Sequence, residues 1–222
     1  MDLLPYLIAV LILSGIYLIR AEVRNERKLI YIFKPIATIS VIIIAALALP
    51  RGGAYLPYSI MILLGLLFSF FGDMALMFPR NLKAFRLGLA NFLIAHLVYS
   101  VAFLSLGEFS EIHIIPIAML AFVSGSFFMI IKQGLASMKI PVISYIIIIT
   151  LMVGSAISIQ GAGRISCLAG TLVLMGAILF YVSDLILAAN RFWKPWKYNR
   201  ISLAFYYSGQ LLIALSPHHL LV

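Results

Sequence analysis

The stretch YSIMILLGLLFSFFGDMALMF, residues 58–78, decides what kind of protein this chain forms. About 20 predominantly apolar residues in helical form cross the roughly 30 Å of hydrocarbon in a bilayer, and this stretch is long enough to do so. Its single charged side chain is Asp73. The stretch therefore predicts a transmembrane helix that carries a carboxyl group within the membrane.

Comparable apolar segments fill most of the remaining chain. Of the 222 residues, 64% are hydrophobic and 10% are charged, whereas a soluble domain is about half apolar and a quarter charged. We predict an all-α polytopic membrane protein with eight transmembrane helices in a single transmembrane domain, residues 1–222. The other seven predicted segments are 3–19, 31–49, 87–106, 112–131, 140–159, 165–190 and 199–217.

The basic residues predict how the helices are oriented. The net charge is +9, but the positive residues are dispersed through short loops, which argues against a nucleic-acid partner. All of the 16 Lys and Arg residues except Arg51 and Arg164 fall in alternate loops. The positive-inside rule places these loops in the cytosol and both termini on the non-cytoplasmic side.

Two segments resemble each other. FFGDMALMFPR, residues 70–80, and YVSDLILAANR, residues 181–191, have the same spacing from aspartate to arginine. This likeness predicts a duplicated four-helix unit, with halves 1–106 and 107–222 in parallel orientation. The two aspartates, Asp73 and Asp184, would then lie at equivalent depths.

Asp73 and Asp184 are the candidate functional groups because they lie inside apolar segments. A carboxylate at the centre of a membrane helix costs roughly 2.5–3.5 kcal/mol on insertion scales, so it normally faces a partner or a wet cavity. A simpler interpretation is that each aspartate reaches toward the cytosol and pairs with an arginine two turns later, Arg80 or Arg191.

Further polar side chains are predicted at the same depth, in the cytosolic half of the membrane. Each of them alone has an ordinary structural explanation, and Asn91 and His96 lie about 140° apart around an ideal helix. Together they predict a polar chamber that opens toward the cytosolic side. The group comprises Lys34, Asn91, His96, Ser202, Tyr206, Tyr207 and Gln210.

Five motifs make the chain recognisable: Lys34-Pro35, FGDMAL around Asp73, NFLIAHLVY at 91–99, GAILFYVSDLILA around Asp184 and YYSGQLLIA at 206–214. In order and spacing they resemble the YhhN/TMEM86 family of membrane lysoplasmalogenases. The resemblance implies an eight-helix membrane enzyme that hydrolyses the vinyl-ether bond of lysoplasmalogens. The products would be a fatty aldehyde and glycerophosphoethanolamine or glycerophosphocholine, and the catalytic pair would be Asp73 and Asp184.

The chemistry of a vinyl ether suits two carboxyl groups. Acid protonates its β-carbon to give an oxocarbenium ion, water adds, and the hemiacetal collapses. One carboxyl must hold a proton while the other is anionic, a division that glycosidases use on a similar cation. We therefore expect the two aspartates to meet and to share a proton, without assigning the acid to either one.

The other polar residues receive supporting roles in this hypothesis. A lysophospholipid in the bilayer is the expected partner, in a bacterial inner membrane or the endoplasmic reticulum. No metal or other cofactor is expected, and the single Cys167 excludes a cysteine metal cluster. Positioning of the carboxyl pair is assigned to His96, Asn91, Tyr207 and Gln210, and binding of the lipid phosphate at the cytosolic boundary to Lys34, Arg80 and Arg191.

Three other functions remain possible at this point. A proton-coupled transporter would also have duplicated halves and intramembrane carboxylates, although its site should lie nearer the midplane. An intramembrane aspartyl protease lacks support because its Gly-x-Gly-Asp and Pro-Ala-Leu motifs are missing. A purely structural membrane protein gives no reason for two buried carboxylates.

Overall fold

The fold is taken from a computed structural model, which describes residues 3–50, 52–78, 81–196 and 200–220. Within these ranges the chain is helical, as predicted, and has eight α-helices and four short 3₁₀ turns. The α-helices are α1 (Leu4–Arg24), α2 (Arg27–Leu47), α3 (Leu56–Leu76), α4 (Leu82–Leu106), α5 (Ile114–Ile131), α6 (Lys139–Ser158), α7 (Cys167–Phe192) and α8 (Ile201–Leu215). The 3₁₀ turns are η1 (Glu111–His113), η2 (Lys132–Gly134), η3 (Ala136–Met138) and η4 (Ser216–His219).

Seven of the described helices, α1 to α7, are long and apolar enough to cross a membrane, α5 and α6 together with their flanking 3₁₀ turns. The chain is therefore an integral membrane protein. The eighth predicted segment, 199–217, does form a helix, but α8 has only 15 residues. At 1.5 Å per residue it is roughly 22 Å long, shorter than the hydrocarbon layer. Eight complete spans therefore stay a prediction.

Several helix boundaries differ from the predicted ones. The basic stretch at residues 20–28 is mostly helical, because α1 continues to Arg24 and the turn is limited to Asn25 and Glu26. Asn25 has φ 57°, the left-handed conformation that often ends a helix. Helix α2 therefore begins at Arg27. At the start of α4, the Asn81 side chain accepts hydrogen bonds from the amides of Lys83 and Ala84, an ordinary N-cap.

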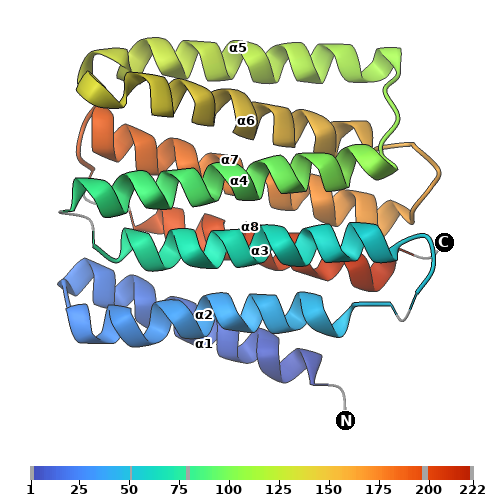
Figure 1. The fold of residues 1–222 in the computed structure, drawn as a ribbon, viewed down its shortest axis with the longest axis horizontal. Coiled ribbons are helices and arrows are strands. Elements are labelled where there is room, and N and C mark those ends of the chain that lie inside the picture. Colours follow the sequence, from blue (N-terminus) through green and yellow to red (C-terminus); the bar gives the residue numbers. More distant parts are fainter. Residues whose placement is uncertain (1–2, 51, 79–80, 197–199, 221–222) are drawn as a thin grey trace.

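The helices are antiparallel neighbours in one bundle (Figure 1). In this view α5 and α6 lie on one side, α1 and α2 on the other, and α3, α4, α7 and α8 lie between them. Close helix pairs depend on glycines: a Cβ added to Gly72 of α3 would lie 2.7 Å from the Phe92 ring of α4. A Cβ on Gly209 of α8 would lie 2.7 Å from the carbonyl oxygen of Gly176 in α7. Small residues at such positions let membrane helices approach closely.

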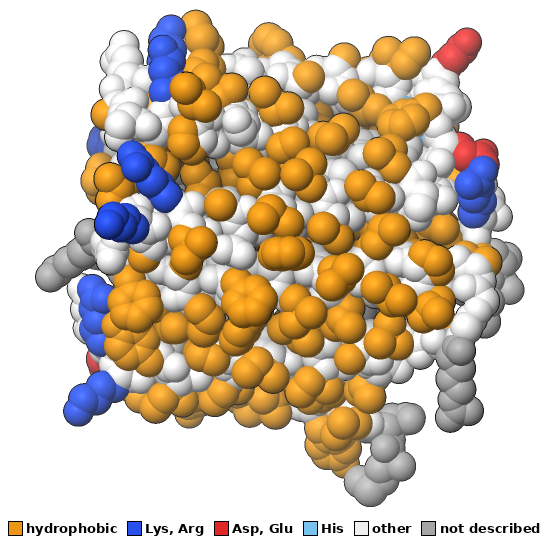
Figure 2. All heavy atoms as spheres, in the orientation of Figure 1, with side chains coloured by type: hydrophobic (Ala, Val, Ile, Leu, Met, Phe, Trp, Pro, Cys, Tyr) orange, Lys and Arg blue, Asp and Glu red, His pale blue; other side chains and the backbone are white. Residues whose placement is uncertain are grey.

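The surface is that of a protein surrounded by lipid. Hydrophobic side chains cover the long face in Figure 2, whereas most of the Lys and Arg side chains in view gather at one end. That end holds the C-terminal ends of α1, α3, α5 and α7 (Figure 1). Helix α1 begins at the opposite end, where η4 also lies. The placement of both termini on the non-cytoplasmic side stays a prediction, as does the duplication of the two halves.

Candidate active site

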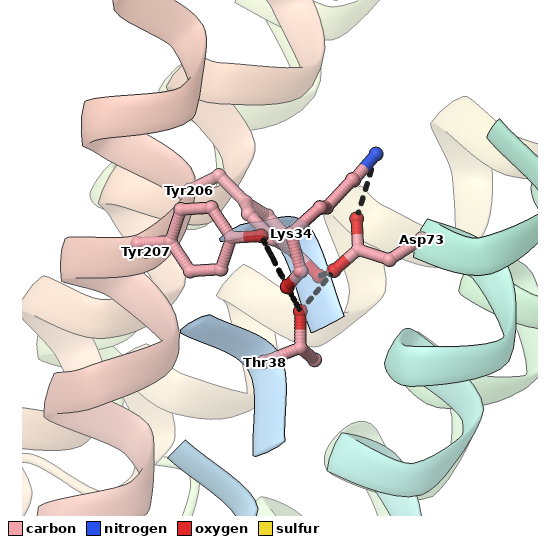
Figure 3. A network of polar contacts seen from close by, with 5 residues as sticks. All are labelled: Lys34, Thr38, Asp73, Tyr206 and Tyr207. Atoms are coloured by element: carbon pink, nitrogen blue, oxygen red, sulfur yellow. Dashed lines mark hydrogen bonds and ion pairs between the residues drawn. The ribbon is translucent and has the colours of Figure 1, made fainter. Parts of the chain in front are cut away.

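Asp73 lies in a closed network formed by α2, α3 and α8 (Figure 3). Its Oδ1 is 3.3 Å from Nζ of Lys34. Its Oδ2 accepts hydrogen bonds of 2.8 Å from the hydroxyls of Thr38 and Tyr206. The Asp73 side chain is 3% exposed. Both carboxylate oxygens therefore accept from hydrogen-bond donors, and this arrangement stabilises a buried carboxylate in its charged form.

Lys34 does not lie where the sequence predicted. It was expected at the start of its helix, where it would hold a lipid phosphate, but α2 begins two turns earlier, at Arg27. Lys34 is therefore carried into the bundle, where its side chain is 7% exposed and pairs with Asp73. Tyr207 lies beside this network as expected, with its hydroxyl 3.3 Å from the Thr38 hydroxyl and 3.5 Å from the Lys34 carbonyl oxygen.

Asp184 has different surroundings, formed by α4, α6 and α7. Its Oδ2 accepts a hydrogen bond of 2.5 Å from the Tyr145 hydroxyl and lies 3.7 Å from Nε2 of His96. Nδ1 of His96 hydrogen-bonds to the Phe92 carbonyl oxygen one turn earlier in α4. The imidazole ring packs edge-on against Phe180 and Tyr145, with centroid distances of 4.7 and 5.3 Å. The Asp184 side chain is 13% exposed.

The two carboxylates are connected through aromatic rings. Tyr206, which donates to Asp73, packs against Phe180 with a centroid distance of 5.1 Å, and Phe180 packs against His96. No hydrogen bond joins Asp73 to Asp184 among the described residues, since each uses its own partners. A proton shared directly by the two aspartates therefore stays a prediction. No metal-binding group of three His, Cys, Asp or Glu side chains occurs in the described part of the chain.

An apolar pocket leads to Asp184. Aromatic and aliphatic side chains of α3 to α7 line it. Asp184 and Arg191 are its charged lining residues. The guanidinium carbon of Arg191 lies 4.3 Å from the centroid of the Phe85 ring, at the end of the bundle where α4 begins and α7 ends. The wall of the pocket is thus almost entirely apolar and includes Asp184 and Arg191, whereas Asp73 is not among its lining residues.

Two of the predicted supporting residues do not reach either carboxylate. The amide of Asn91 donates to the carbonyl oxygen of Leu87 in its own helix, 2.8 Å away. Its expected positioning role is therefore not supported, because the side chain bonds back to α4. Gln210 is buried, as expected for a core residue, yet neither atom of its side-chain amide has a hydrogen-bond partner among the described residues. Arg80 lies outside the described residues.

Tyr145 and Thr38 are the functional candidates that the sequence reasoning missed. A signal for Tyr145 was present: it precedes Asp184 by 39 residues, and Lys34 precedes Asp73 by the same interval. The match follows from the predicted duplication, which would place Lys34 and Tyr145 at corresponding positions of α2 and α6. Thr38 offers no comparable signal, because threonine is common at the interfaces between membrane helices.

The fold and the site define a class of integral membrane protein: a helical bundle with a buried carboxyl group at an apolar pocket whose rim is cationic. The chain belongs to the YhhN family, whose model matches residues 29–217. It is 31% identical over 169 residues to the Homo sapiens protein "Lysoplasmalogenase TMEM86B". It is also 31% identical over 167 residues to the Bos taurus protein "Lysoplasmalogenase TMEM86A".

These matches cover 75% and 72% of this chain. They span 66% of each relative, just under two thirds of its length. No solved structure matches the chain. The family membership therefore rests on sequence, and the geometry of the site rests on the structure described above.

Proposed function

We propose that this protein is a membrane hydrolase that cleaves the vinyl-ether bond of lysoplasmalogens to a fatty aldehyde and glycerophosphoethanolamine or glycerophosphocholine. Two relatives carry the name lysoplasmalogenase. The observation that carries the proposal is the pocket in which Asp184 and Arg191 share an otherwise apolar lining. Such a pocket suits a lipid with one long chain, one phosphate and one acid-labile bond between them.

The pocket suggests how the lipid lies. Arg191 follows Asp184 by seven residues on α7, which corresponds to roughly 10 Å along a helix. The phosphate binds at Arg191, whose planar guanidinium offers two parallel hydrogen bonds to phosphate oxygens. The vinyl ether, a few bonds deeper, then reaches Asp184, and the hydrocarbon chain continues among the apolar side chains. Phe85 and Phe192 place one side of the pocket at the basic end of the bundle, which the positive-inside rule assigns to the cytosol.

The two aspartates have unequal roles in this mechanism. Asp184 lines the pocket and is the acid that protonates the β-carbon of the vinyl ether. Asp73 is the anionic member of the pair, stabilised in its charged form by Lys34, Thr38 and Tyr206. The rings of Tyr206 and Phe180 lie between it and the Asp184 site. The charge of Asp73 acts on the oxocarbenium ion through space, and its hydrogen bonds hold α2, α3 and α8 around the site. Asp184→Asn should therefore reduce turnover more than Asp73→Asn at equal amounts of folded protein.

The experiment is aldehyde detection with purified protein in detergent or liposomes. The substrates are lysoplasmenyl-ethanolamine, lysoplasmenyl-choline and their acyl counterparts. We expect aldehyde from the vinyl ethers, little fatty acid from the acyl lipids, and a fall of more than about 10³-fold for Asp184→Asn, the usual scale for losing an essential acid. Fatty acid release without aldehyde, or normal turnover by folded Asp184→Asn, contradicts the proposal.

A further inference from the structure

His96 is the one neighbour of Asp184 whose hydrogens can be assigned from geometry. Its Nδ1 is hydrogen-bonded to the backbone carbonyl oxygen of Phe92. A carbonyl oxygen only accepts hydrogen bonds, so Nδ1 must carry a hydrogen. Nε2 is then either a bare lone pair, in the neutral ring, or a second N–H, in the cation. In both states Nε2 is the ring atom that faces Asp184, at 3.7 Å from Oδ2.

A bare Nε2 facing an ionised carboxylate would leave two acceptors opposite each other in a dry environment. The His96 side chain is 1% exposed, and Nε2 has no hydrogen-bond partner among the described residues. A buried acceptor without a donor is destabilising, and a buried charge without a partner is more so. One proton on either member of the pair removes this conflict, because it turns one of the facing atoms into a donor.

Neighbouring side chains do not supply that proton. Tyr145 donates its hydroxyl hydrogen to Asp184 Oδ2 and keeps it. Of the other titratable groups that line the pocket, the Tyr181 hydroxyl is 2.7 Å from the Ser124 hydroxyl, and Arg191 lies over the Phe85 ring. Asp73 lies on the other side of the Phe180 and Tyr206 rings, and both of its carboxylate oxygens already have partners in Lys34, Thr38 and Tyr206.

We infer that His96 and Asp184 hold one proton between them, resting on Asp184 while His96 is neutral, and that His96 takes part in the reaction through Asp184, the member of the pair that lines the pocket. The neutral arrangement is favoured because an imidazolium–carboxylate pair would have to be charged among Phe180, Phe92 and the other apolar walls of the pocket. The partner with which Asp184 shares its proton is thus a histidine from α4 and not the second aspartate. This role in the reaction rests on the proposed function, whereas the resting proton does not.

The reaction then balances within the pair. Asp184 gives its proton to the β-carbon as the π bond opens, leaving a carboxylate beside the oxocarbenium ion. Water adds to the α-carbon and its proton passes to the Asp184 carboxylate, which shares it with Nε2 of His96. Asp184 then protonates the ether oxygen as the carbon–oxygen bond breaks, and the hydroxyl proton of the hemiacetal returns to the Asp184–His96 pair. The aldehyde and the glycerophospho-base leave, and the pair is restored.

The resting proton is tested by infrared spectroscopy of purified protein without substrate. We expect a carboxylic-acid C=O band at neutral pH that disappears in Asp184→Asn, persists in Asp73→Asn and shifts in His96→Asn. A wild-type spectrum without an Asp184-dependent band overturns the inference. This measurement needs no turnover, so it tests the resting proton even if the protein does not act on vinyl ethers.

The role of His96 in the reaction is tested with His96→Asn, since an asparagine can keep the bond to the Phe92 carbonyl, as Asn91 does with Leu87 in the same helix. We expect kcat to fall about 100-fold or more, with KM little changed, and added imidazole to restore part of the rate. His219→Asn, at an exposed site near the opposite end, is the matched control and should retain full turnover. Turnover by His96→Asn within threefold of wild type, or a loss that imidazole does not restore in folded protein, overturns the role of His96 while leaving the proposed function intact.

Discussion

Asp73 lies in the last turn of α3 and Asp184 about two turns before the end of α7, and they face different partners. The residue that precedes Asp73 by 39 positions is a lysine, Lys34, whereas the residue that precedes Asp184 by 39 positions is a tyrosine, Tyr145. Lys34 provides a full positive charge beside Asp73, whose side chain is 3% exposed. Both carboxylate oxygens of Asp73 have partners, because Thr38 and Tyr206 donate hydrogen bonds to the second oxygen. Tyr145 provides one neutral donor, and the Asp184 side chain, 13% exposed, lines an apolar pocket.

The difference shows how one buried carboxyl can serve structure and another can serve chemistry. A charge that is fully paired and hydrogen-bonded is stable in a low-dielectric interior. A carboxyl with a neutral donor and an unmatched imidazole beside it can exchange a proton with a substrate. Substitutions in each of the two sites test this difference.

The largest effect on stability is expected from Lys34→Met. This change leaves the Asp73 carboxylate without its cation, and breaking a buried ion pair on one side typically costs about 3–5 kcal/mol. The double variant Lys34→Met/Asp73→Asn should regain most of this loss, because Thr38 and Tyr206 can still donate to the asparagine oxygen. Reversible unfolding in mixed detergent micelles measures the difference, and Lys28→Met, at an exposed site near the start of the same helix, is the control. Equal losses in the single and the double variant would show that the ion pair is not the cause.

Arg191→Gln should weaken substrate binding. Charge-assisted hydrogen bonds contribute about 1.5–3 kcal/mol, which corresponds to roughly a 10- to 100-fold rise in KM with kcat much less affected. A vinyl-ether substrate that lacks the phosphate, a 1-alkenylglycerol, should not distinguish the variant from wild type. Arg164→Gln, at the other end of the bundle in an exposed pair with Glu108, is the control. An equal loss on both substrates would contradict the phosphate role.

Tyr145→Phe and Tyr206→Phe remove one phenol from each carboxyl site. Loss of one hydrogen bond is worth about 1–1.5 kcal/mol, so Tyr145→Phe should lower kcat about tenfold. Tyr206→Phe should instead lower the free energy of unfolding by about 1 kcal/mol, with a smaller effect on kcat. The pair is measured by aldehyde release and unfolding on the same preparations. If Tyr206→Phe reduces kcat more than Tyr145→Phe, the assignment of Asp184 as the acid is wrong.

Asn91→Ala should have the smallest effect. The Asn91 amide bonds only to the Leu87 carbonyl among the described residues, a local bond that competes little with the helix itself. We expect a change in the free energy of unfolding within about 0.5 kcal/mol, as for substitutions away from special sites. Turnover should stay within twofold of wild type. A tenfold loss of activity would show that Asn91 has a role in the active site despite its hydrogen bond to Leu87.

Much of the fold and part of the site could be predicted from the sequence. A bilayer permits spanning chains to form little other than helices and closed barrels, so long apolar runs predict helices directly. Asp73 and Asp184 were visible for the same reason, since a carboxyl inside such a run is costly. Helix ends were less predictable: the segment predicted at 31–49 begins four residues earlier, at Arg27, because part of the basic stretch is helical.

Contacts between helices were not predictable from residue types. The sequence placed His96 and Asn91 about 140° apart around one helix, but it did not show which of them faces a carboxylate. The rotation of α4 turns His96 toward Asp184 and leaves Asn91 bonded to its own backbone. The direction of hydrogen bonds was not predictable either, because the bond to the Phe92 carbonyl determines which nitrogen of His96 faces the carboxylate. The proposed division of roles between the two aspartates depends on these contacts.

Hydrophobicity and charge act within each helix, so residue order is enough to predict a helical membrane protein with two carboxyl groups inside its apolar segments. The contacts between helices show that Lys34 neutralises one carboxyl while Tyr145, His96 and an apolar pocket surround the other. Those partners come from helices separated by tens of residues. Their meeting depends on how each helix is rotated and how closely glycines let it approach its neighbour, and both are properties of packing between helices.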